Sequence, residues 1–224
     1  MGIWLSDSLS HTISLNTIIN NEECIHLRYS KSSIIIDNNL SLNNYSIILY
    51  DCDNNTITRN NVSNNGDGIG FIASNNNIIT YNKINANNVS GLWFMGGQYN
   101  IICNNIISKS LDGINLQSHN NMFKNNSISN NKCGIDLFQS YGNTIQKNNF
   151  LENERDVDFL NLFIDILKRK NIWKENYWDR PRIFPKPIFG KIVILLINYR
   201  AILITWIAFD WHPAKEPYKI EGVI

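Results

Sequence analysis

The chain has 224 residues, of which 17% are charged, and its formal net charge is +1. No long stripe of Lys or Arg supplies the phosphate electrostatics that drive nucleic-acid affinity, so we expect no nucleic-acid partner. The four cysteines form no C-x-x-C pair and occupy no facing positions on neighbouring repeats, which favours free, half-buried thiols.

Asparagine recurs in a fixed register along most of the chain. The first seven of eight such residues are separated by 21 to 23 positions, and the eighth follows after a longer gap. A fixed period of this length is typical of a solenoid. The eight residues are Asn16, Asn38, Asn60, Asn82, Asn105, Asn126, Asn148 and Asn176.

Each repeat carries three short β-strand signals. A small residue is followed by an apolar-x-apolar pair, such as Ile69 and Phe71, and then by two further apolar positions, such as Ile79 and Ile84. Period-two alternation puts these side chains on one face, and coils stacked about 4.8 Å apart would enclose an apolar column. We therefore predict an all-β fold, a single-stranded parallel β-helix of about eight coils over residues 1–178. The coils are predicted to start at Gly2, Cys24, Ser46, Gly68, Gly91, Gly113, Gly134 and Asp156.

The repeated asparagine is predicted to lie at the corner that opens the third strand of each coil. Asparagine tolerates left-handed backbone geometry at tight corners. Its amide can also bond the same amide one coil above and below. We expect this column to be a structural ladder rather than a row of ligand contacts.

The repeat changes near the C-terminus. An insertion at about residues 160–171, with the sequence LNLFIDILKRKN, predicts an excursion or a short amphipathic helix. Residues 179–224 no longer repeat and are predicted to form a short irregular C-terminal cap. The apolar run 192–209 approaches the length of a membrane span, but Asn198 and Arg200 near its middle would be costly in a bilayer. We therefore expect strands or a core segment there rather than a membrane anchor.

The coil pattern G-I-x-L…N-T-I-x-x-N-x-I-x-x-N-N, as in GIWLSDSLSHTISLNTIINN and SIILYDCDNNTITRNNVSNN, resembles the NosD-like right-handed parallel β-helix repeat family. The resemblance covers residues 2 to about 178, and the tail segment FDWHPAKEPY is similar to the element that follows these repeats in archaeal members. It implies a right-handed β-helix of the carbohydrate-binding or sugar-hydrolase type and an extracellular or cell-surface location. No signal peptide is visible, and the chain begins inside a coil, which suggests a truncated open reading frame, a fragment or a misplaced start codon.

The resemblance also suggests a copper site, since the named member of the family serves copper delivery to nitrous-oxide reductase. Copper sites need clustered Cys, Met or His side chains. Cys24 and His26 share a coil and a side, but two ligands are too few, so we expect no copper site. The four histidines, His11, His26, His119 and His212, fall in different columns.

The outer face of the first strand is where β-helix enzymes of this resemblance bind polysaccharide. An aromatic ring offers a flat apolar face to a sugar, so the predicted carbohydrate-binding residues are Tyr50 and Trp93, with Asn115 and Gln117 in the next coil. Exposed apolar surface marks a binding site when it stays uncovered. The alternative is that the C-terminal run, a missing N-terminal segment or another protomer covers it. The apolar patch comprises Ile48, Tyr50, Ile72, Trp93 and Met95.

Asp136 and Asp158 fall in one outward column, one coil apart, so their β-carbons are expected about 5 Å apart. That spacing is the retaining-glycosidase arrangement, and like-charge repulsion would raise one pKa, which makes the pair the candidate catalytic residues. The same oxygens could hold Ca²⁺, the only cofactor that the sequence suggests. Alternatively, crowding by the insertion, or neutralisation by Lys147 or Arg155, would leave ordinary surface charge.

Two other pairs of polar residues are assigned structural roles. Asp51 and Asp53 flank a corner, where aspartate is usually a turn former. Asp210 and His212 belong to the tail element, for which we also expect a structural use.

These expectations define three hypotheses of function. The leading one is a non-catalytic β-helix of a surface or secreted protein, serving structure or carbohydrate binding through the Tyr50 and Trp93 face. The runner-up is a polysaccharide lyase or hydrolase that uses Asp136 and Asp158. The third is a spacer in a larger surface array.

Overall fold

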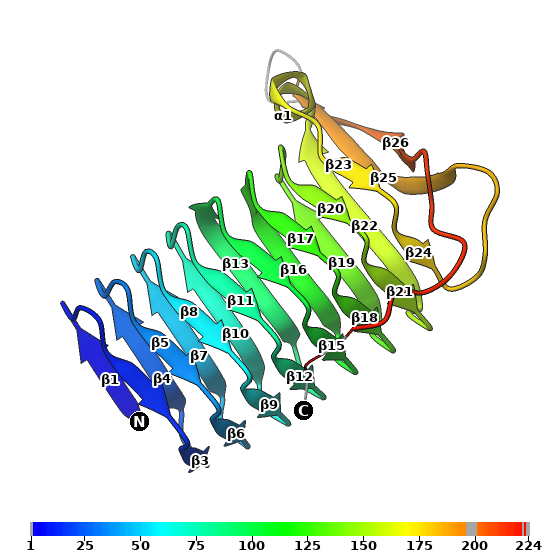
Figure 1. The fold of residues 1–224 in the computed structure, drawn as a ribbon. Helices are drawn as coiled ribbons and strands as arrows, with labels where there is room; N and C mark the ends of the chain where they lie inside the picture. The colour runs from blue at the N-terminus through cyan, green and yellow to red at the C-terminus, as the bar shows by residue number, and fades with distance from the viewer. Residues whose placement is uncertain (1, 196–200, 221, 223–224) are drawn as a thin grey trace.

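The computed structural model describes residues 2–195, 201–220 and 222 (Figure 1). Over this part of the chain, successive coils stack along one axis, and each coil adds one strand to each of three sheets. Strands of neighbouring coils pair in parallel. The helix found among these residues is the single short α1 (Phe163–Lys168). The predicted all-β parallel β-helix is therefore confirmed.

The strands of the three sheets follow each other in coil order. The first sheet comprises β1 (Ile3–Ser6), β4 (Glu23–Arg28), β7 (Tyr45–Tyr50), β10 (Asp67–Ile72), β13 (Ser90–Gln98), β16 (Asp112–His119), β19 (Cys133–Phe138), β22 (Arg155–Leu162), β25 (Lys186–Leu195) and β26 (Ala201–Asp210). The second comprises β2 (Thr12–Ser14), β5 (Ile34–Ile36), β8 (Thr56–Thr58), β11 (Ile78–Thr80), β14 (Ile101–Cys103), β17 (Met122–Lys124), β20 (Thr144–Gln146) and β23 (Ile172–Lys174). The third comprises β3 (Thr17–Ile19), β6 (Asn39–Ser41), β9 (Asn61–Ser63), β12 (Lys83–Asn85), β15 (Ile106–Ser108), β18 (Ser127–Ser129), β21 (Asn149–Leu151) and β24 (Tyr177–Trp178).

The core is the apolar column that the alternation predicts. In β10, Ile69 and Phe71 are fully buried, and the Phe71 ring stacks on Phe94 one coil away, with the centroids 4.8 Å apart. Phe150 stacks in the same way on Trp178, at 4.4 Å. Full burial of a side chain of this size is worth roughly 1.5–3 kcal/mol, so each coil is stabilised mainly by the coils on either side.

The asparagine column forms the predicted ladder. Asn60 donates from both its backbone N and its Nδ2 to Oδ1 of Asn82, each at 3.0 Å. The same Nδ2 donates to the carbonyl oxygen of Ile35, at 2.9 Å. Equivalent side-chain bonds join the column from Asn16 to Asn176. The amides therefore form hydrogen bonds with backbone groups at the buried corner of the coil, where unpaired backbone groups would be costly.

One detail of the corner differs from the prediction. The left-handed residue is the one before each ladder asparagine, as in Arg59 (φ 53°) and Tyr81 (φ 57°). The turn at that exposed position directs the following amide inward, where it meets the next coil. Two further ladders, which the sequence reasoning missed, run through the other corners, with Asn55 bonded to Asn77 and Asn43 bonded to Asn65.

Asp210, at the end of β26, closes the main ladder. Its Oδ2 accepts hydrogen bonds from the backbone N of Asn176 at 2.9 Å and from Asn176 Nδ2 at 3.0 Å. The same oxygen accepts a bond from Nε1 of Trp178 at 3.1 Å. A carboxylate thus takes the place of the amide oxygen of a further coil, which agrees with the structural role expected for this residue.

The C-terminal segment extends the first sheet. β25 pairs in parallel with β22, and β26 pairs antiparallel with β25. The apolar run 192–209 therefore forms strands where it is described, while Asn198 and Arg200 lie outside the described residues. No helix in the described ranges is long and apolar enough to span a membrane. The division into a β-helix of residues 1–178 and a cap of residues 179–224 stays a prediction.

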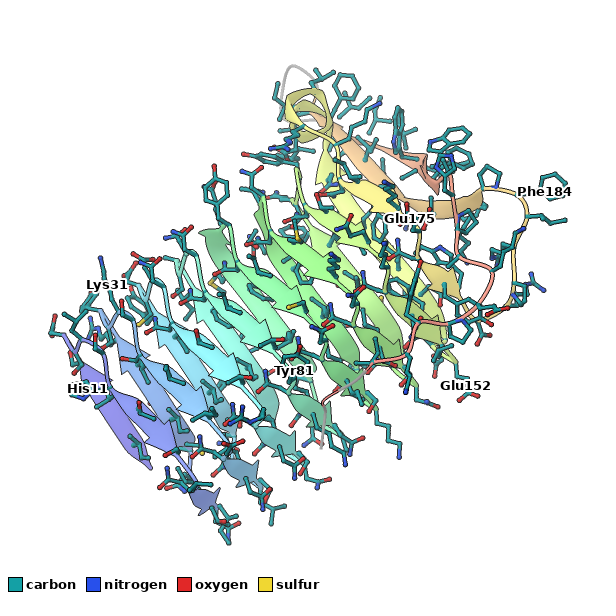
Figure 2. The ribbon with its side chains drawn as sticks, viewed as in Figure 1. His11, Lys31, Tyr81, Glu152, Glu175 and Phe184 are labelled. Carbon is teal, nitrogen blue, oxygen red and sulfur yellow. The ribbon has the colours of Figure 1, made fainter. Side chains whose placement is uncertain are left out.

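The final residues run back along the third sheet (Figure 1). Tyr218 exchanges two backbone-to-side-chain hydrogen bonds with Asn149, at 2.7 and 2.8 Å, and its hydroxyl donates to the carbonyl oxygen of Glu175. Figure 2 shows Tyr81 beside the end of this tail, and Phe184 on the loop that precedes β25. The tail thus ties the last coils to the middle of the solenoid.

Candidate functional site

The outer face of the first sheet carries the candidate residues in the predicted columns. Gly70 pairs with Trp93, and Trp93 pairs with Asn115. Asn115 pairs in turn with Asp136, which pairs with Asp158. The strands β7 to β22 follow one another in a single sheet along the axis of the helix (Figure 1). These residues therefore form one column across that sheet.

Gly70 determines the shape of the aromatic part of this face. A Cβ atom at residue 70 would overlap the Trp93 indole, so only glycine lets the ring lie across the strand. Ile48, which pairs with Gly70, is buried at 7% exposure. The prediction that Ile48 belongs to an exposed patch is therefore wrong.

The rest of the patch is accessible. Met95 is 55% exposed, and Tyr50 and Ile72 are half-buried. The C-terminal hairpin continues the sheet beyond β22, so it does not cover β7, β10 and β13 as one alternative expected. Nε1 of Trp93 is buried and has no hydrogen-bond partner in the described structure. A buried donor without a partner is costly.

Two groups in the first coils extend the aromatic face toward the N-terminus. Trp4 stacks on His26, with ring centroids 4.8 Å apart, and His26 Nδ1 lies 2.9 Å from Oε2 of Glu23. The Arg28 guanidinium lies over the Tyr50 ring, at 5.4 Å from its centroid. Trp4 and His26 share the column of Trp93, so their place on this face could have been predicted from the spacing, whereas their stacking could not.

The acidic end of the face is more crowded than the predicted pair. Burial raises the pKa of Asp136, and the nearby charges of Asp112 and Asp158 raise it further. Burial also raises the pKa of Asp112, whose Oδ2 accepts a hydrogen bond from Asn115 Nδ2 at 3.2 Å. The sequence reasoning missed Asp112, which lies three residues before Asn115 on the same strand.

Asp158 is neutralised by Arg155, through a contact of 2.5 Å between Nη1 and Oδ2. The side chain of Asp158 keeps 40% of its exposure, so the insertion does not bury it. Lys147 is not the neutralising group, because it pairs with Glu175 at another corner. Asp136 therefore lies near a second carboxyl, Asp112, and near the ion pair of Asp158 with Arg155, and its pKa is raised.

The donor set does not fit a copper ion, since among the described residues no group of three or more His, Cys, Asp and Glu side chains is placed to hold a metal. Burial raises the pKa of the Cys24 and Cys133 thiols to about 12 and also raises that of Cys52. Burial thus disfavours the thiolate form, which is the metal ligand.

The remaining candidates serve the scaffold. Oδ1 of Asp53 accepts hydrogen bonds from the backbone N and Nδ2 of Asn75, and Asp51 has a left-handed backbone, as expected of a turn former. The backbone N of His212 donates to Oδ1 of Asp210 within the ladder closure.

The fold is that of a parallel β-helix protein. The chain belongs to the NosD family, described as periplasmic copper-binding protein (NosD), whose model matches residues 1–183. No curated protein is significantly similar to the chain in sequence.

Three solved structures share its fold. The A-module of Azotobacter vinelandii mannuronan C-5 epimerase AlgE4 has a TM-score of 0.63 at 13% identity, over 67% of this chain and 50% of the other. The AlgE6 A-module from the same organism has a TM-score of 0.55 at 10% identity, over 97% and 55% of the two chains. A mutant of the periplasmic alginate epimerase AlgG has a TM-score of 0.52 at 20% identity, over 71% and 45%. The chain thus spans about half the length of these proteins, and the likeness is one of fold.

Proposed function

We propose that this chain is the β-helix of an extracytoplasmic protein that binds polysaccharide along the outer face of its first sheet. The observation that carries the proposal is the Trp93 indole lying across Gly70, on a face that also carries the exposed Met95. An aromatic face suits a sugar ring. Tyr50 lies two coils away on the same sheet, and Asn115 and Gln117 offer hydrogen-bonding groups one coil on. The NosD family and the alginate epimerase AlgG are both described as periplasmic, which supports the location.

The proposal is tested by retention on immobilised polysaccharides, with alginate in the panel because of the epimerase folds. We expect Trp93→Ala to weaken retention on a glycan that the wild type binds, by about tenfold, since stacking of this kind contributes on the order of 1 kcal/mol or more. Tyr99→Ala is the matched control, because Tyr99 is an exposed aromatic residue at a corner outside this face. Unchanged retention in Trp93→Ala, or no retaining glycan, contradicts the proposal.

A second candidate function is catalysis on the same polysaccharide, as a lyase, hydrolase or epimerase. It is favoured by Asp136, whose raised pKa suits a group that holds and transfers a proton. If this function holds, the double variant Asp136→Asn with Asp158→Asn loses turnover of the bound glycan and keeps retention. A spacer, the third hypothesis, shows neither retention nor turnover.

A further inference from the structure

A cavity of about 330 Å³ lies at the C-terminal end of the solenoid, between the last coils and β26. Aromatic rings from three segments line it, namely Phe159 of β22, Trp173 of β23, and Trp206 and Phe209 of β26. None of the residues predicted to form a site contributes to it. Its volume is at the lower end of the range for small-molecule sites, about 300–1,000 Å³.

The charged side chains in the wall of the cavity are both positive. Arg169 and Lys170, both exposed, line it together with Asn161 and Asn171. No Asp or Glu belongs to the lining among the described residues. Nη1 of Arg169 makes one long hydrogen bond, 3.4 Å, to Asn120, so most of its donors remain available to a ligand.

Asn161 lies in the wall of the cavity. Its side chain is 6% exposed, and its Oδ1 accepts a hydrogen bond from the backbone N of Ser140 at 2.8 Å. That bond engages only the oxygen of the amide, which leaves Nδ2 to a ligand. Nδ2 of Asn171, by contrast, donates to the carbonyl oxygen of Ser140.

We propose that this cavity binds a small amphipathic anion, a carboxylate with an apolar body. The body contacts the rings of Trp206 and Phe209, as apolar groups enter aromatic-lined pockets. The carboxylate accepts from Arg169 and Lys170, whose charges have no acidic counterpart in the wall, and Asn161 Nδ2 donates to an oxygen of the ligand. A neutral or cationic molecule of the same shape gains only the apolar part of this interaction.

The test is calorimetric titration of the whole chain with decanoate, decanol and decyltrimethylammonium, which share the apolar chain and differ in charge. We expect decanoate to bind at least tenfold more tightly than either of the others. The double variant Arg169→Ala with Lys170→Ala is expected to lose at least tenfold in decanoate affinity. Both residues are exposed, so this variant keeps the fold.

Lys83→Ala with Lys132→Ala is the matched control, because it removes two exposed cations far from the cavity and changes the net charge equally. It is expected to bind decanoate as the wild type does. Equal affinity for the three probes, unchanged affinity in the Arg169 and Lys170 variant, or no saturable binding overturns the proposal. Trp93→Ala leaves decanoate binding unchanged, so this result is separate from that of the polysaccharide proposal.

Discussion

The inner corner of the coil and the outer face of the first sheet differ in how fully their polar side-chain groups are hydrogen-bonded. At the corner, Asn82 donates to three oxygens from Nδ2 and accepts two hydrogen bonds at Oδ1. On the outer face, the same coil register presents Trp93 with an unpartnered Nε1 and Asp136 with a raised pKa. Saturated polar groups stabilise a fold, whereas groups left short of partners or held in an unfavourable charge state are common at functional sites. The difference supports the proposal of a binding site on the sheet face and assigns stability to the corner.

Breaking the ladder is expected to have the largest effect. Asn82→Ala removes the acceptor of Asn60 and leaves the carbonyl oxygen of Ile57 without its side-chain donor. Each buried polar group left unpaired costs about 1–3 kcal/mol, so the free energy of unfolding should fall by roughly 3–5 kcal/mol in urea titrations. Asn61→Ala is the matched control, since Asn61 is exposed and should change stability by less than about 0.5 kcal/mol. Similar losses in both variants would contradict the assignment of stability to the corner.

Asp136→Asn is expected to change the free energy of unfolding by a smaller amount and in the opposite direction. Because the pKa of Asp136 is raised in the folded chain, its contribution to stability is complete below the unfolded pKa and is lost as the pH rises through the folded pKa. The variant should therefore be more stable than the wild type at pH 7, and the gain should vanish as the pH falls toward 4.

Asp37→Asn provides the comparison of opposite sign, measured in the same unfolding series. The Arg59 side chain holds the pKa of Asp37 below its usual value. Its stabilisation is present above the unfolded pKa and is lost as the pH falls through the folded pKa, so this variant should be less stable at pH 7. If the stability of the two variants relative to the wild type changed with pH in the same direction, the difference in environment between Asp136 and Asp37 would be contradicted.

The sequence could predict whatever follows from the repeat. The coil starts, the inward residues and the columns of the first sheet depend only on spacing, and for this reason Trp93, Asn115, Asp136 and Asp158 fall in the predicted column. Contacts that depend on side-chain shape could not be predicted in this way. The Trp93 ring lies over Gly70 because that residue has no side chain, and spacing alone does not show this.

Contacts made by residues outside the repeat also could not be predicted from the sequence. Asp210 reaches Asn176 only because β26 turns back antiparallel to β25. The cavity likewise combines Arg169, from the insertion, with Trp206, from the hairpin. Neither segment shares the coil register, so nothing in the spacing relates their positions.

The most direct test of the account is oxidative footprinting of two methionines with and without a retained polysaccharide. Met95, 55% exposed, lies on the outer face of the first sheet, and Met122, 38% exposed, lies on the second sheet. If the first-sheet face binds the glycan, saturation slows oxidation of Met95 several-fold and leaves Met122 unchanged. Equal protection of both residues, or protection of Met122 alone, would contradict the placement of the binding site on the first sheet.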